Sequence, residues 1–327
     1  MNITVKDIAK KAGVAPSTVS RAFNDENIAE DTKKKILEVA EQYNFKPRNY
    51  DRKKSQETTK NIGILHPFPL SSGDYYSHVV NGIQENIENY NMNIHFYSLT
   101  DNEEENIKKI GEKIKNQNLK GLIFTSVLVK KELMSKIKER FKIPIVAIDN
   151  DAFNKNVDCI VNDDYTGAKN IVKHLIELGH ENIVFFGRSR ELFCFKERFR
   201  GYKDAFRDFD FDIDWDLINF FLSKDEIYDK KLYEEAYNFF KNINKKISAV
   251  FATSDKTAIT IISVLKELGY KIPEEVSIAG FDDIDIAKYM SPSLTTVKIN
   301  KKELGIMAAK RINNLIENNG FKPLKIT

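Results

Sequence analysis

Side chains that could recognise a partner are gathered in one stretch near the N-terminus, TVKDIAKKAGVAPSTVSRAFN, at residues 4–24. At helical spacing, its second half presents a polar face made of Ser17, Thr18, Ser20, Arg21 and Asn24. An arginine guanidinium can donate two hydrogen bonds to O6 and N7 of guanine, which gives about 1–3 kcal/mol of discrimination between bases. The pattern favours a DNA-reading helix over an ordinary helical hairpin with a solvated face.

Two short helices must position this face. Thr4 with Asp7 three residues later predicts a reciprocal cap at the start of the first helix. Gly13 stands where the turn needs a positive φ, and Pro16 suits the first position of the second helix. Val19 and Phe23 are expected to face inward. This spacing is that of a helix-turn-helix.

A third helix is predicted over residues 31–44, and residues 1–45 are expected to form one small domain. Its apolar stripe consists of Ile36, Leu37, Ala40 and Tyr43. Residues 46–60 lose this periodicity, and five of the nine residues from 46 to 54 are basic. We predict a basic hinge that follows DNA phosphates, with a solvated linker as the alternative. The net charge is +3 for the whole chain.

From residue 61 onward, short apolar runs alternate with amphipathic stretches. Strands are predicted at 62–65, 94–97, 121–125, 145–148, 159–161, 183–186, 249–252 and 276–280, and helices at 79–90, 166–178, 196–206, 228–240 and 256–268. Near-continuous apolar strands between helices predict α/β lobes with parallel sheets covered on both faces. We expect two doubly wound lobes, approximately 61–160 with 290–325 crossing back, and 161–290. Ligands bind beyond the carboxyl ends of such strands.

Four further segments resemble a known family. They are KHLIELGHENI at 173–183, RFRGY at 198–202, IPEEVSIAGFDD at 272–283 and LTTV at 294–297. Together with the N-terminal stretch, they resemble the lactose/galactose repressor (LacI/GalR) family of transcriptional regulators over nearly the whole chain. The resemblance implies a homodimer that binds double-stranded operator DNA. It also implies a periplasmic-binding-protein-like core that answers to a small effector, a sugar or sugar phosphate.

The resemblance also assigns residues by position. Thr4, Ser20 and Asn24 would contact phosphates, and Pro16, Ser17 and Arg21 would occupy base-reading positions beside Thr18. In the hinge, Arg52, Lys53 and Lys54 replace the small helix and the leucine that the family inserts into the minor groove. A lysine cannot unstack a base step as an apolar wedge does, so the contact of this hinge is expected to be electrostatic.

Asp149, Arg198 and Asp282 match the family's effector-binding positions. Carboxylates accept hydrogen bonds from hydroxyl groups and arginine donates them, which suits a sugar. Less specific candidates are Asp163 and Asp255, for which helix capping is the alternative, and His66, Phe68 and Tyr75, which could form an apolar platform or belong to the core.

Other function classes fit less well. The two cysteines, Cys159 and Cys194, form no CxxC pair, and no dinucleotide-binding or P-loop motif occurs. We therefore expect no cofactor and no enzyme. No apolar run approaches the roughly 20 residues that span a bilayer, and no signal peptide is recognisable, so we expect a cytoplasmic protein. Alternatives are a sugar-binding transport protein and a regulator controlled by a protein co-regulator.

Overall fold

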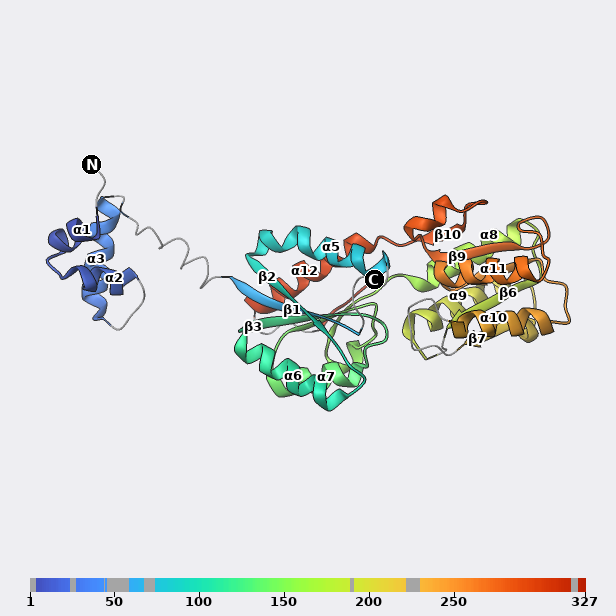
Figure 1. Ribbon diagram of the computed structural model, residues 1–327, viewed down its shortest axis with the longest axis horizontal. Coiled ribbons are helices and arrows are strands. Elements are labelled where there is room, and N and C mark those ends of the chain that lie inside the picture. Colours follow the sequence, from blue (N-terminus) through green and yellow to red (C-terminus); the bar gives the residue numbers. More distant parts are fainter. Residues whose placement is uncertain are drawn as a thin grey trace. The chain divides into compact units, whose positions relative to one another are not determined.

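The computed structural model describes residues 4–23, 28–43, 45, 59–67, 74–188, 191–221, 230–318 and 323–327 (Figure 1). The chain divides into two compact units, residues 1–60 and 61–327. We describe each unit separately. No helix in these described ranges combines the length and the apolar character needed to cross a membrane.

The N-terminal unit is a three-helix domain made of α1 (Val5–Ala12), α2 (Pro16–Phe23) and α3 (Glu30–Gln42). The backbone amide and the hydroxyl of Thr4 both donate to the Asp7 carboxylate, at 2.9 and 2.6 Å. Gly13 ends α1 with φ +70°, a conformation that glycine adopts without a steric penalty. The predicted cap, turn and start of α2 at Pro16 are therefore confirmed.

The core of this domain is small and apolar. Its buried residues are Ile8, Ala9, Ala12, Val19, Ala22, Ile36 and Ala40. Phe23 is only partly buried and meets the Phe45 ring at 6.1 Å, edge to face. The prediction for Tyr43 was wrong: α3 ends at Gln42, so Tyr43 leaves the helical stripe, is 41% exposed and lies under the Lys11 ammonium.

The first lobe of the larger unit contains a six-stranded sheet in the order β11-β5-β4-β3-β1-β2. Its strands are β1 (Lys60–His66), β2 (Met92–Ser98), β3 (Leu119–Thr125), β4 (Ile145–Ile148), β5 (Asp158–Ile160) and β11 (Lys325–Ile326). Helices α5 (Asp74–Ile87) and α12 (Lys301–Glu317) cover one face, and α6 (Glu103–Asn116) and α7 (Lys131–Phe141) cover the other (Figure 1). Alternate strand residues fill the two apolar layers.

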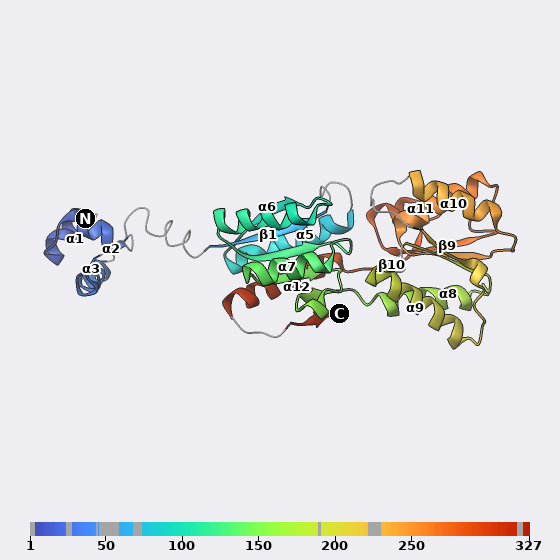
Figure 2. The same cartoon turned by 90° about the horizontal axis from the view of Figure 1, so that it is seen from below.

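The second lobe contains a five-stranded sheet in the order β10-β9-β8-β6-β7. Its strands are β6 (Ile183–Arg188), β7 (Ile218–Phe221), β8 (Ala249–Ala252), β9 (Ser277–Asp282) and β10 (Thr295–Lys298). Helices α8 (Asp164–Glu177) and α9 (Phe193–Asp208) cover one face, and α10 (Lys230–Asn242) and α11 (Asp255–Glu267) cover the other (Figure 2). Short 3-10 helices lie at Glu88–Tyr90, Phe153–Lys155, Trp215–Leu217 and Asp285–Tyr289, the last labelled η5.

The predicted α/β class with parallel strands is confirmed, because the pairings of β3 with β1 and β4, of β5 with β4 and β11, of β6 with β7 and β8, and of β9 with β8 and β10 are all parallel. The chain passes between the lobes after β5 and after β10. The expected return at residue 290 was too early, since Thr295 pairs with Ala279 and Lys298 with Asp282 in the second sheet. The return to the first lobe therefore begins after Lys298.

Candidate functional site

The exposed face of α2 is the one that the sequence predicts. Pro16, Ser17, Ser20 and Arg21 are exposed and Thr18 is partly exposed, whereas Val19 and Ala22 face the core. Hydroxyl groups and a guanidinium on one helical face can donate to phosphates and to base edges. Thr4 is exposed at the start of α1, where its hydroxyl donates to Asp7. The other candidates for DNA contact, Asn24, Arg52, Lys53 and Lys54, lie outside the described residues.

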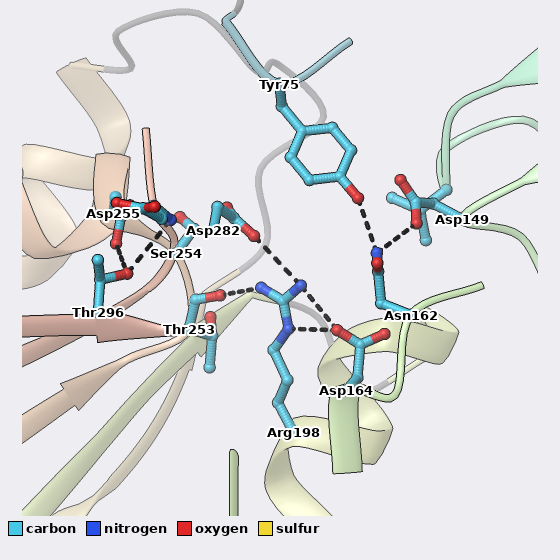
Figure 3. Close-up of polar contacts among 12 residues, drawn as sticks. Tyr75, Asp149, Asn162, Asp164, Arg198, Thr253, Ser254, Asp255, Asp282 and Thr296 are labelled. Atoms are coloured by element: carbon cyan, nitrogen blue, oxygen red, sulfur yellow. Dashed lines mark hydrogen bonds and ion pairs between the residues drawn. The ribbon is translucent and has the colours of Figure 1, made fainter. Parts of the chain in front are cut away.

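A buried polar cluster lies where strands of the larger unit end. Figure 3 shows Arg198 of α9 with the carboxylates of Asp164, at the start of α8, and Asp282, at the end of β9. Arg198 Nε and Nη2 both lie 2.8 Å from Asp164 Oδ1, and Nη2 lies 3.3 Å from Asp282 Oδ1. Nη1 donates to the carbonyl of Thr253, the residue after β8. Arg198 is 5% exposed, and its guanidinium stacks on the Phe281 ring, 3.7 Å from the ring centroid.

A second chain of hydrogen bonds joins the cluster to the first lobe. Asn162, in the connection that follows β5, donates its amide to the Tyr75 hydroxyl at 2.7 Å and to Asp149 Oδ1 at 2.8 Å (Figure 3). Tyr75 belongs to α5 and Asp149 follows β4. One side chain of a segment that connects the lobes therefore holds two polar groups of the first lobe.

Three aspartates at the ends of strands β4 and β9 have unusual backbone conformations. Asp149 has φ +57°, Asp282 φ +114° and Asp283 φ +53°, all in the range that non-glycine residues seldom adopt. Strained residues of this kind concentrate at functional sites. The Lys301 ammonium holds the turn after β9 by donating to the main-chain carbonyls of Asp282 and Asp283 at 2.5 and 2.8 Å.

Burial dominates the electrostatics of the cluster. Desolvation raises the pKa of Asp149 and that of Asp282 to about 7, against the lowering effects of the Tyr75 hydrogen bond on the first and of Arg198 on the second. Desolvation also raises the pKa of Asp164, although Arg198 opposes it. The same cause raises the pKa of the Tyr75 hydroxyl well above its ordinary value, so this phenol stays neutral.

The weaker candidates separate into different roles. Asp163 is exposed and caps α8, accepting from the Thr166 amide at 3.0 Å, so the alternative of helix capping is confirmed. Asp255 caps no helix end; its buried carboxylate accepts from the Ile284 amide at 2.8 Å and from the Thr296 hydroxyl at 2.5 Å. It therefore fixes the loop after β9 against α11.

His66 belongs to the interior of the first lobe. It is 4% exposed, and its Nδ1 is paired with the carbonyl and the hydroxyl of Thr125. Burial lowers the pKa of this imidazole. Its ring contacts Tyr76, which in turn contacts Tyr75 at 5.0 Å between ring centroids. His66 therefore supports Tyr75 from behind, and Phe68 lies outside the described residues.

Sequence reasoning missed four residues of the cluster: Asn162, Asp164, Thr253 and Lys301. Asp164 follows the same strand as Asp163, and only its contact with Arg198 distinguishes it from a second capping residue. Among the residues that the structure describes, no group of histidine, cysteine and acidic side chains could hold a metal ion. Both cysteines are buried free thiols.

Comparison with known proteins decides the family. The sequence model described as periplasmic binding proteins and sugar binding domain of the LacI family matches residues 59–327, and the model of bacterial regulatory proteins, lacI family, matches residues 4–48. The chain belongs to the LacI family. LacI-family chains of this organisation are DNA-binding transcriptional regulators, and the helix-turn-helix unit and the two-lobed core seen here are the two parts that the models match.

Relatives of this LacI-family chain match along its whole length. The HTH-type transcriptional repressor PurR of Histophilus somni is 27% identical over 320 residues, which cover 97% of this chain and 93% of the relative. The transcriptional regulator CelR, solved as a complex with cellobiose, superposes with a TM-score of 0.71 at 19% identity, over 99% of this chain and 96% of CelR. The lac repressor dimer bound to operator and the anti-inducer ONPF superposes with a TM-score of 0.71 at 18% identity. The match covers 100% of this chain and 96% of the lac repressor chain. These two structures support the fold.

Proposed function

We propose that this LacI-family regulator is a cytoplasmic repressor of carbohydrate-utilisation genes, and that Arg21 reads bases of its operator. The observation that supports this most directly is the exposed polar face of α2 on a helix-turn-helix with the expected turn at Gly13. Thr4, Pro16, Ser17, Thr18, Ser20 and Asn24 are proposed to contact DNA with it. The basic residues Arg52, Lys53 and Lys54 are proposed to add affinity along the phosphates.

The polar cluster is the proposed effector site. The carboxylates of Asp149 and Asp282 and the Tyr75 hydroxyl can accept hydrogen bonds from sugar hydroxyl groups, and Arg198 can donate them. A cellobiose complex among the structural neighbours and the description of the matched family model agree with a carbohydrate. A transport-type sugar-binding protein would not need the N-terminal helix-turn-helix. A protein co-regulator remains the second candidate for the controlling partner.

A homodimer is proposed as the DNA-binding form. The lac repressor structure is a dimer on its operator. In this chain, η5 (Asp285–Tyr289) exposes Ile286 and Tyr289, which are 53% and 78% accessible. Exposed apolar surface of this kind is typical of interaction surfaces when it forms a patch.

Arg21→Ala tests the DNA-reading assignment. Genomic DNA fragments bound by the full-length protein are sequenced, and the enriched site is titrated with both proteins by fluorescence anisotropy. Loss of one bidentate base contact should weaken specific binding about 10- to 100-fold and bring it near non-specific binding. Arg140→Ala, on the exposed surface of α7, is the matched control. Unchanged sequence preference in Arg21→Ala would refute the assignment.

Asp282→Asn tests the effector site. A thermal-shift screen of monosaccharides, disaccharides and their phosphates on the full chain identifies a ligand, because binding to the folded state raises its stability. The variant should lose the ligand-induced change in operator affinity and keep operator binding without ligand. Glu234→Gln, an exposed carboxylate on α10, is the control. A normal response in Asp282→Asn would show that the effector binds elsewhere.

A further inference from the structure

The polar cluster holds more negative than positive charge. Arg198 is the one cation that bonds the side chains of Asp164 and Asp282 within the described part of the chain, and its donors go to these two carboxylates and to the Thr253 carbonyl. Asp149 receives a hydrogen bond from the neutral amide of Asn162. Two carboxylates therefore share one guanidinium, and the third, Asp149, is held by a neutral donor.

Two further charged residues with hydrogen bonds around the cluster, among those that the structure describes, leave this imbalance in place. Lys301 donates to main-chain carbonyls rather than to a carboxylate. Asp255 is held by neutral donors, the Ile284 amide and the Thr296 hydroxyl. With Asp255 the cluster has four carboxylates, and with Lys301 it has two cations. If all six groups are charged, two negative charges are in excess.

An excess of this kind is costly in a buried site. Asp149, Asp164 and Arg198 are each less than 8% exposed. Buried charges are normally paired, because desolvation is compensated only by an opposite charge with good geometry. Here protons supply part of the compensation, since burial raises the pKa of Asp149 and of Asp282 to about 7. A ligand that brings its own positive charge would replace those protons.

A buried hydroxyl also lacks a partner in this region. The Thr253 side chain is fully buried, and its Oγ1 has no hydrogen-bond partner in the described structure, although the carbonyl of the same residue accepts from Arg198. Buried polar atoms are satisfied in the great majority of cases. The region around Arg198 is therefore short of hydrogen-bond partners as well as of positive charge.

We propose that the effector is an amino sugar, whose protonated amine binds the carboxylates of Asp149 and Asp282. This inference rests on the proposed function, because it takes the cluster to be the effector site. Tyr75 and Asn162 would pair with ring hydroxyl groups. A neutral sugar would leave the excess charge buried, and a sugar phosphate would add to it, so both are disfavoured.

Matched ligands on the full-length protein test the proposal. Isothermal titration calorimetry at pH 7.5 compares D-glucosamine, D-galactosamine and D-mannosamine with their parent hexoses, N-acetyl derivatives and 6-phosphates. One free amine should bind at least about tenfold more tightly than its hexose and N-acetyl derivative, as expected for a charge pair in a desolvated site. The corresponding phosphate should bind most weakly.

Asp149→Asn and Asp282→Asn complete the test, with Glu234→Gln as the exposed control. Each of the two cluster variants should reduce the preference for the amine about tenfold, and the control should keep it. A hexose or a phosphate that binds as tightly as its amine, or a preference unchanged in both cluster variants, would overturn the inference and leave a sugar effector in place. If no ligand of the panel binds, the amino-sugar inference fails, and the thermal-shift screen with disaccharides decides separately whether the proposed sugar effector fails.

Discussion

Replacing Asp149 by asparagine is expected to stabilise the protein, and more so at high pH. Asparagine tolerates the left-handed backbone at φ +57° and keeps an oxygen that can accept from Asn162. It removes the charge whose burial raises the Asp149 pKa from 3.8 to about 7. That difference in pKa corresponds to about 4 kcal/mol of destabilisation of the charged form.

The pH dependence follows from the direction of this shift. Between pH 3.8 and about 7 the folded state binds a proton at Asp149 that the unfolded state has released, so the stability of the wild type falls as the pH rises through this window. Above about pH 7 the full penalty is present. Asp149→Asn should therefore gain up to about 4 kcal/mol at pH 8 and about 2 kcal/mol at pH 5. These are upper limits, because the repulsion from Asp164 and Asp282 is shared among the carboxylates.

Thermal unfolding of the full chain without ligand measures the effect. At about 2 °C per kcal/mol for a unit of this size, the Tm should rise by up to about 8 °C at pH 8 and by about half as much at pH 5. Asp163→Asn is the matched control, since Asp163 is an exposed cap and asparagine also caps helices. A lower Tm for Asp149→Asn at pH 8, or an equal rise at both pH values, would refute the electrostatic reasoning.

Other predictions test the packing and the assembly. Gly280→Ala should destabilise the second lobe by about 1–3 kcal/mol in urea unfolding, because a Cβ there would lie 2.2 Å from Asp255 Oδ1; unchanged unfolding would contradict that close approach. Arg311→Met should cost about 3–5 kcal/mol in the same assay, because it leaves the Asp158 carboxylate, 1% exposed, without its cation; a neutral result would mean that the pair adds nothing. Tyr289→Asp should shift the protein toward monomer in sedimentation velocity while its circular dichroism stays unchanged, and an intact dimer would exclude η5 from the interface.

Hydrophobic patterning predicted most of the core but not its edges. The strands β4 (Ile145–Ile148) and β8 (Ala249–Ala252) coincide with the predicted ranges, because strands buried on both faces are continuous apolar runs. The edge strand β7 (Ile218–Phe221) was not predicted. Only its last residue is buried, because an edge strand is covered on fewer sides. The short sequence INFF therefore lacks the continuous apolar run that identifies a strand buried on both faces.

The candidate site could be predicted only in part. The resemblance to the family named Asp149, directly after β4, and Asp282, the last residue of β9, and the structure brings both into the polar cluster. Asp163 and Asp164 are adjacent in the sequence and follow the same strand, yet one caps a helix in solvent and the other pairs with Arg198. Sequence spacing cannot separate the two, because the decision depends on α9, which lies more than 30 residues away in the sequence.

The positive φ angles of Asp149, Asp282 and Asp283 limit which amino acids these positions can accept. Asparagine and glycine enter the left-handed region most easily, whereas β-branched side chains are strongly disfavoured there. The backbone conformation of the core therefore restricts which amino acids can occupy the positions that are proposed to bind the ligand. A change of ligand specificity in this protein should arise more readily at Tyr75 or Asn162, whose side chains can be exchanged without a penalty from such a backbone conformation.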